Sequence, residues 1–299
     1  MSESTGERNT KAGIVALAGA PNVGKSTLLN RILGRHLSIE SAKPQTTRVR
    51  IAGIENRGGV QLVFTDTPGI HRPRERGGLN ARMVASARAG IHGADVVCWL
   101  LAADRGLTPV DRAEAENLAQ ARTVAVINKI DTVARDALLP IMAAVGELLP
   151  ESDCLPLSAR SGEGVEALVD LLCDAAPKGP WLFEGDQITD QNERLLFAEL
   201  VREQLFRQMS QELPYRVAVV VDEFSRVGGE IRLAASVFTD SDGSKKMIVG
   251  KGGRRIKSIG IAARRAAAEL AGTTVHLSLQ VRVKKNWQRD TAFLRELGL

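Results

Sequence analysis

The alternation of apolar and polar positions in the first part of the chain predicts an α/β domain. Up to about residue 176, apolar runs rich in β-branched residues are separated by stretches of helical character. This order predicts a largely parallel sheet flanked by helices. Ligands of such sheets bind beyond the carboxyl ends of the strands, where polar residues follow several of these runs. The apolar runs are 13–19, 60–66, 95–103, 123–129 and 154–158, and the helical stretches include Ser26–Leu33 and Ala134–Leu149.

The second part of the chain has a different order of elements. Residues 177–192 contain Pro, Gly and mixed polar residues, which is typical of a linker. A smaller α+β domain follows, with a Gly-rich turn leading into a long helix. Its predicted elements are an amphipathic helix at Glu193–Met209 and strands at Arg216–Asp222, Glu230–Phe238 and Thr274–Val283. We therefore expect a flexible N-terminus (1–10), a first domain (11–176), a linker (177–192) and a second domain (193–299).

Composition fits a cytosolic protein of two folded domains. Of 299 residues, 44% are hydrophobic and 25% charged, which is close to the average for globular domains. The N-terminus has no apolar stretch that would indicate a signal peptide, and the longest apolar run is too short to span a bilayer as a helix. Cys98, Cys154 and Cys173 have no pairwise spacing typical of disulfide frameworks or zinc sites.

Positive charge is concentrated near the C-terminus. Residues 245–289 contain 12 Lys or Arg and one acidic residue, Glu269, although the whole chain carries a net charge of only +5. This distribution indicates binding to a polyanion.

A glycine-rich loop at 19–26 fits the phosphate-binding loop pattern. It follows an apolar run and precedes a helix, as that motif requires. Backbone amides and the helix N-terminus would bind phosphates, Lys25 would bridge the outer phosphates, and the Ser26 hydroxyl would bind Mg²⁺. The alternative is a glycine turn with an N-capping serine. The predicted phosphate-binding residues are Gly19, Asn22, Val23, Gly24, Lys25, Ser26 and Thr27.

A second motif, Asp66-Thr67-Pro68-Gly69, ends the next apolar run. There a carboxylate would hold Mg²⁺ through water and the Gly69 amide would face a γ-phosphate. Thr46 and Thr47 are both candidates for a switch threonine that completes the metal shell only with a triphosphate bound, and their spacing does not distinguish them. The predicted metal ligands are thus Ser26, Asp66 and either Thr46 or Thr47.

Two further motifs predict recognition of guanine. Asn128, Lys129 and Asp131 follow one apolar run, and Ser158 and Ala159 follow another. The Asp131 carboxylate would accept two hydrogen bonds from the guanine base, which adenine cannot supply. At about 1.5–3 kcal/mol each, these bonds would discriminate by about two to four orders of magnitude. A backbone amide after Ser158 would lie near the guanine O6, so we expect GTP or GDP as the ligand.

A GxxG turn lies within the basic region between two predicted helices. Its glycines would let the backbone approach about four nucleotides while nearby cations bind phosphates, as in KH domains. The apolar residues Ile248, Ile256 and Ile259 would anchor the fold while lining the groove. The alternative is a solvated basic helix. The predicted RNA-binding residues are Gly250, Lys251, Gly252, Gly253, Arg254, Arg255 and Lys257.

These motifs in this order resemble the Era family of bacterial GTPases, within the wider TrmE–Era–EngA-like group. The resemblance runs from about Lys11 to Leu299 and rests on GxPNVGKS, QTTR, DTPG, NKID and the C-terminal GxxG module. It implies a P-loop GTPase domain followed by a type II KH domain. It also implies that a monomer binds single-stranded RNA, the 3′ end of 16S rRNA, in assembly of the 30S subunit, in the cytoplasm or peripherally on the inner membrane face.

One position departs from Ras-like chemistry. Ile70 stands where many GTPases have a glutamine that orients the attacking water, so we expect slow intrinsic hydrolysis. The resemblance makes Asn22 a candidate ligand for K⁺, which would replace an arginine finger.

Two other functions remain open on the sequence. A GTP-dependent RNA-modifying enzyme would need a catalytic cysteine, a metal cluster or a second cofactor motif, and none is evident. A peripheral membrane GTPase in cell-cycle or division control would use the basic patch on anionic lipids instead of RNA.

Overall fold

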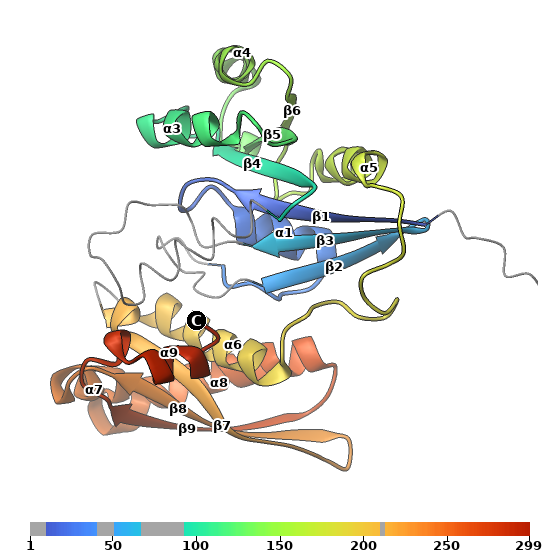
Figure 1. Ribbon diagram of the computed structural model, residues 1–299. Helices are drawn as coiled ribbons and strands as arrows, with labels where there is room; N and C mark the ends of the chain where they lie inside the picture. Colours follow the sequence, from blue (N-terminus) through green and yellow to red (C-terminus); the bar gives the residue numbers. More distant parts are fainter. Residues whose placement is uncertain (1–9, 41–50, 67–92, 210–212) are drawn as a thin grey trace, which may run out of the picture. The chain divides into compact units, whose positions relative to one another are not determined.

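The computed structural model describes residues 10–40, 51–66, 93–209 and 213–299 (Figure 1). The chain forms two compact units. In the described residues, the first unit contains 10–34, 51–66 and 93–190, and the second contains 35–40, 191–209 and 213–299. Each unit has a hydrophobic core of its own.

The first unit is built on a six-stranded sheet of order β2-β3-β1-β4-β5-β6. Five strands are parallel, which confirms the predicted sheet, whereas the edge strand β2 is antiparallel to β3. The sequence did not predict β2. The strands are β1 (Lys11–Ala18), β2 (Ile51–Arg57), β3 (Val60–Asp66), β4 (Val96–Ala102), β5 (Thr123–Asn128) and β6 (Asp153–Pro156).

Helices cover both faces of this sheet. Helices α1 (Lys25–Leu33) and α5 (Val165–Ala175) pack on one face, around Val15, Leu17 and Phe64. Helices α3 (Pro109–Leu118) and α4 (Leu138–Leu148) pack on the other, around the fully buried Trp99. The helix predicted from Ala134 starts later than expected, because a 3₁₀ turn occupies Arg135–Ala137 and Pro140 fits only the first turn of a helix.

Residues 177–190, which are most of the predicted linker 177–192, lie along the β2–β3 side of the first unit. It forms isolated bridges from Lys178 to Lys11 and from Thr189 to Gly53. The Gln61 side-chain oxygen accepts hydrogen bonds from the backbone N–H groups of Leu182 and Phe183 at 2.7 and 2.9 Å. The division between the units therefore follows Asp190.

The second unit is an α+β fold on a three-stranded sheet of order β7-β8-β9, as predicted. Strands β7 and β8 form an antiparallel hairpin around Gly228 and Gly229, and β9 runs parallel to β8. The elements are α6 (Glu193–Gln208), β7 (Val217–Val227), β8 (Glu230–Thr239), α7 (Asp242–Val249), α8 (Arg254–Ala271), β9 (Val275–Val283) and α9 (Thr291–Glu296), with short 3₁₀ turns at Leu213–Arg216, Lys251–Gly253 and Trp287–Arg289.

The two faces of this sheet have different partners. Helices α6 and α8 pack on one face in a core that includes Ile248 and Ile259, both fully buried. The C-terminal helix α9 packs on the other face through Phe293, whose ring contacts Trp287 and Phe238 edge-on. Cations on α8 and on α9 therefore lie on opposite sides of the sheet.

No helix in the described part of the chain is long and apolar enough to cross a membrane. The three cysteines are free thiols, and burial raises the pKa of Cys98 to about 12. Within the same described residues, no cluster of three His, Cys, Asp or Glu side chains forms a metal site.

Candidate nucleotide and RNA sites

The predicted phosphate loop connects β1 to α1 at the carboxyl edge of the sheet. Gly24 caps α1 in the left-handed conformation, with φ of 101°. A Cβ atom added there would lie 2.2 Å from the side-chain nitrogen of Asn128. Glycine is therefore required at this position by both the backbone angle and the neighbouring side chain. The first turn of α1 contains no acidic residue, so its N-terminus can attract an anion.

Lys25 is buried, with 7% of its side chain exposed. Its Nζ donates hydrogen bonds to the backbone carbonyls of Gly19 and Ala20 at 2.7 and 3.1 Å. Burial lowers the pKa of Lys25, while the nearby carboxylates of Asp66 and Glu114 oppose that change. The lysine is thus held inside its own loop by backbone oxygens, which phosphate oxygens could replace.

Two oxygen ligands predicted for Mg²⁺ are adjacent. The Ser26 hydroxyl at the start of α1 donates a hydrogen bond to Asp66 Oδ2 at the end of β3, at 2.8 Å. Mg²⁺ prefers such hard oxygen donors, so this pair fits the predicted metal. The remaining predicted switch residues, Thr46, Thr47, Thr67, Pro68 and Gly69, lie outside the described residues, as does Ile70.

Asn128 connects three loops of the predicted site. Its side-chain nitrogen donates to the Val23 carbonyl at 2.8 Å, and its side-chain oxygen accepts from the amides of Lys129 and Ala159 at 2.7 and 2.9 Å. The three loops follow β1, β5 and β6, respectively. One buried side chain therefore fixes the spacing between them. The Ala159 amide, predicted near the guanine O6, donates to Asn128 in this structure.

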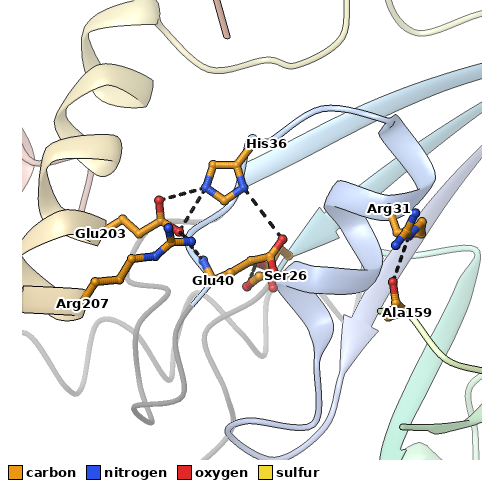
Figure 2. A network of polar contacts seen from close by, with 8 residues as sticks. Ser26, Arg31, His36, Glu40, Ala159, Glu203 and Arg207 are labelled. Atoms are coloured by element: carbon orange, nitrogen blue, oxygen red, sulfur yellow. Dashed lines mark hydrogen bonds and ion pairs between the residues drawn. The ribbon is translucent and has the colours of Figure 1, made fainter. Parts of the chain in front are cut away.

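The predicted base-recognition residues also lie together. The Ser158 hydroxyl donates to Asp131 Oδ1 at 2.7 Å, which orients the carboxylate expected to bind guanine. Lys129 adopts a left-handed conformation, and its Nζ forms an ion pair with Asp104 at 3.0 Å. Arg31 of α1 donates to the Ala159 carbonyl at 3.0 Å and joins this loop to the phosphate loop helix (Figure 2).

Glu114 on α3 is a buried residue that the sequence did not indicate. It is only 4% exposed, and its Oε1 accepts a hydrogen bond from the Gly19 amide at 3.1 Å. Burial raises its pKa, and the charge of Lys25 opposes that rise. A single Glu on a helix of mixed charge gives no signal in the sequence, because only the fold brings it below the phosphate loop.

The predicted GxxG turn joins α7 to α8. Gly250, Gly252 and Gly253 all have positive φ, and a Cβ on Gly250 would lie 2.8 Å from that of Arg255. The side chains of Lys251, Arg254, Arg255 and Lys257 are exposed, as the prediction requires, and Arg255 donates to the Met247 carbonyl at 2.6 Å.

An apolar groove of about 250 Å³ lies beside this turn, between α8 and β9. Of the three isoleucines expected to anchor the fold while lining the groove, Ile256 lines it, whereas Ile248 and Ile259 are in the core and only anchor the fold. Arg264 and Ile261, whose side chain is 41% exposed, belong to the groove although the sequence did not single them out for binding. A cation-lined apolar groove suits unstacked bases with their phosphates alongside. Its lining is completed by Lys257, Gly260, Leu277 and Leu279.

Comparison with protein families gives two matches that follow the two units. Residues 14–129 match the family described as 50S ribosome-binding GTPase. Residues 212–288 match the KH domain. The first match contains the phosphate loop, Asp66 and Asn128, and the second contains the GxxG turn and its groove.

Relatives are similar over nearly the full chain. The chain is 46% identical to GTPase Era of Geotalea uraniireducens, over 98% of this chain and 99% of that one. It is 43% identical to GTPase Era of a Bradyrhizobium strain, over 97% and 94% of the two chains.

Two solved structures are similar with a TM-score of 0.92 and 36% identity, each over 97% of this chain and 99% of the other. One is an Aquifex aeolicus Era variant bound to GDP·AlF₄⁻. The other is Era in complex with MgGDPNP and nucleotides 1506–1542 of 16S ribosomal RNA.

Proposed function

Because the chain belongs to the Era family of GTPases, we propose that it is a GTP-driven switch that binds single-stranded RNA through its second unit. The RNA is the 3′ end of 16S rRNA, and the role is assembly of the 30S subunit by a cytoplasmic monomer. The observation that carries this proposal is the presence, in one chain, of a guanine-nucleotide site and of a GxxG turn with an adjoining apolar groove.

At the nucleotide site, the described side chains suggest how GTP is bound. Phosphate oxygens would replace the carbonyls of Gly19 and Ala20 as partners of Lys25 Nζ, which is already buried and oriented. Asp131, held by Ser158, would accept the two guanine N–H groups. Mg²⁺, when bound by Ser26 and Asp66, supplies positive charge that offsets the negative charge of the phosphates.

Slow intrinsic hydrolysis remains part of the proposal, because Ile70 cannot orient water. We propose that Asn22 of the phosphate loop would hold K⁺, which would supply the positive charge that an arginine finger supplies in other GTPases. Asn22 adopts a left-handed conformation with φ of 64°, which places it in a tight turn. Turnover of GTP in KCl should exceed turnover in NaCl of equal ionic strength, and equal rates would contradict the potassium assignment.

At the RNA site, cations and apolar surface have separate tasks. The exposed cations around the GxxG turn would bind phosphates, and Ile261 with Leu279 would contact base faces in the groove. Arg264, which also lines the groove, would add positive charge further along α8. The lack of a second cofactor motif in the sequence favours binding over modification of the RNA.

The proposal is tested by RNA affinity in three nucleotide states. A labelled single strand with the 3′-terminal sequence of 16S rRNA is titrated with the full chain in GDPNP, in GDP and without nucleotide. Binding should be tightest with GDPNP and weaker for a scrambled strand of equal length.

An RNA affinity that is the same in all three nucleotide states and the same for the scrambled strand would contradict the proposal. Flotation with anionic vesicles tests the alternative use of the basic patch in peripheral membrane association. Binding to vesicles stronger than to RNA at the same salt concentration would favour a membrane GTPase.

A further inference from the structure

Both backbone polar groups of Gly19, the first residue of the phosphate loop, are bound by side chains. The Gly19 N–H donates to Glu114 Oε1 at 3.1 Å, and the Gly19 carbonyl accepts from Lys25 Nζ at 2.7 Å. The helices that carry these two side chains, α3 and α1, pack on opposite faces of the sheet (Figure 1). The start of the loop is therefore held from both helical layers of the first unit.

The loop is fixed at a second point as well. Asn128 donates to the Val23 carbonyl at 2.8 Å, so the chain between Gly19 and Val23 is anchored at both of its ends. At the first end the backbone lies close against β4, because a Cβ on Gly19 would be 2.4 Å from the Leu100 carbonyl oxygen. The residues between the two anchors consequently have few conformations open to them.

The anchor on α3 is a buried carboxyl group. Glu114 is only 4% exposed, and the charge of Lys25 compensates part of the cost of burying it. Its other oxygen, Oε2, has no hydrogen-bond partner among the described residues, although the indole N–H of Trp99 on β4 lies close enough to lower the pKa of the carboxyl. An apolar side chain of similar size would be buried there at lower cost. What Glu114 adds is an acceptor for the loop amide.

We propose that Glu114 is a positioning residue for nucleotide binding, which acts by holding the phosphate loop through the Gly19 amide. This inference rests on the proposed binding of GTP. When phosphate oxygens replace the Gly19 carbonyl as partner of Lys25, the bond to Glu114 is unaffected, because it uses the N–H group. A loop that is already ordered loses less conformational entropy when the nucleotide binds.

The test measures the affinities of the full chain for GDPNP and for GDP by titration in the presence of Mg²⁺. Glu114→Gln keeps an acceptor for the Gly19 amide and lacks the charge. Glu114→Leu fills a similar volume and lacks the acceptor. The matched controls are Glu116→Gln and Glu116→Leu, which make the same changes at an exposed position of the same helix.

We expect Glu114→Leu to weaken the binding of GDPNP and of GDP by about fivefold or more, the effect of one lost hydrogen bond. Glu114→Gln should bind both nucleotides at least half as tightly as the wild type, and the two Glu116 variants should match the wild type. A purely structural role would lower the unfolding temperature of Glu114→Leu and leave the affinities of the folded protein unchanged.

Two results of the titrations would overturn the inference. One is an affinity of folded Glu114→Leu within twofold of the wild type. The other is an equal loss in Glu114→Gln and Glu114→Leu, which would assign the effect to the charge and not to the hydrogen bond. Failure of the wild type to bind either nucleotide would, by contrast, refute the proposed function together with this inference.

Hydrogen exchange at the Gly19 amide provides a second measurement that needs no nucleotide. Exchange should be slow in the wild type and in Glu114→Gln, and about tenfold faster or more in Glu114→Leu. Rapid exchange at Gly19 in the folded wild type would show that the anchor is absent in solution. That result would overturn the inference even if Glu114→Leu does not fold.

Discussion

The side-chain nitrogen of Asn128 donates a hydrogen bond to the backbone carbonyl of Val23 at 2.8 Å, and so joins β5 to the phosphate loop. Its oxygen accepts from the amides of Lys129 and Ala159. The geometry of the phosphate loop and of the two base-recognition loops is therefore coupled through one residue. Loss of this residue should affect the whole nucleotide site and not the base alone.

Asn128→Ala should weaken GTP binding at least tenfold and destabilise the chain. The change leaves buried polar groups without partners, at roughly 1–3 kcal/mol each. The matched control is Asn117→Ala, which removes an exposed hydrogen bond to Ala113 on α3 and should change stability by less than about 0.5 kcal/mol. Nucleotide titration and thermal unfolding measure both effects, and equal behaviour of the two variants would refute the coupling.

Asp131→Asn should exchange the base preference. The substituted amide presents a donor to guanine N1–H, so GTP binding should weaken by roughly two orders of magnitude. Xanthosine triphosphate, whose C2 carbonyl accepts a hydrogen bond, should regain affinity. An asparagine oxygen can still accept from Ser158, which keeps the loop in place. Asp153→Asn, at an exposed position on β6, is the control. Unchanged GTP affinity in Asp131→Asn would contradict the assignment of Asp131 to guanine recognition.

The stability of the folded protein should depend on pH through the ionisation of Glu114. Its pKa is raised by burial, so its contribution to stability is complete below about 4.5 and declines as the pH rises through the folded value. Glu114→Gln keeps an acceptor for the Gly19 amide and lacks this decline, so its unfolding temperature should exceed that of the wild type increasingly toward neutral pH.

Glu114→Ala separates the charge from the hydrogen bond. It leaves the Gly19 amide unpaired and should be destabilised by about 1–3 kcal/mol at every pH. Parallel unfolding curves for wild type and Glu114→Gln from pH 4 to pH 8 would show that burial does not perturb this carboxyl.

The groove and the cations beside it should respond differently to salt. Lys257→Gln should remove one phosphate contact. The slope of the logarithm of the RNA binding constant against the logarithm of the salt concentration should therefore become shallower by about 0.7, the value for a single strand. Ile261→Ser should weaken RNA binding with the slope unchanged, because it removes apolar contact. Arg295→Gln, on α9 across the sheet, should match the wild type, and an equal loss there would assign the binding to general positive charge.

Sequence patterns predicted the features that depend on local order. The glycines of both loops, the strand ends that carry Asp66 and Asn128, and the helices on either side of the GxxG turn follow from spacing and residue type. Strand β2 was not predicted, because IAGIENR is short and is interrupted by Gly53. That glycine is needed because a Cβ there would lie 2.5 Å from the Leu33 side chain, a contact that only the packing of α1 creates.

Contacts between side chains that are far apart in the chain could not be predicted from the sequence. Glu114 belongs to no motif, and its contact with the Gly19 amide depends on which helix packs beside the phosphate loop. The sequence also did not indicate that Ile261 lines the groove. An exposed isoleucine on a basic helix can be assigned to a groove only when the position of β9 beside that helix is known. The long-range pairing that assembles these groups is set by tertiary packing and not by local propensity.

The central claim is that the nucleotide and the RNA are coupled in one chain, and linkage provides its most direct test. The affinity for GDPNP is measured by titration with and without the 16S rRNA 3′-terminal strand, and the RNA affinity with and without GDPNP. Thermodynamics requires the two ratios to be equal, and we expect each to be about fivefold or more in favour of joint binding. A GDPNP affinity that is the same with and without RNA would contradict the switch.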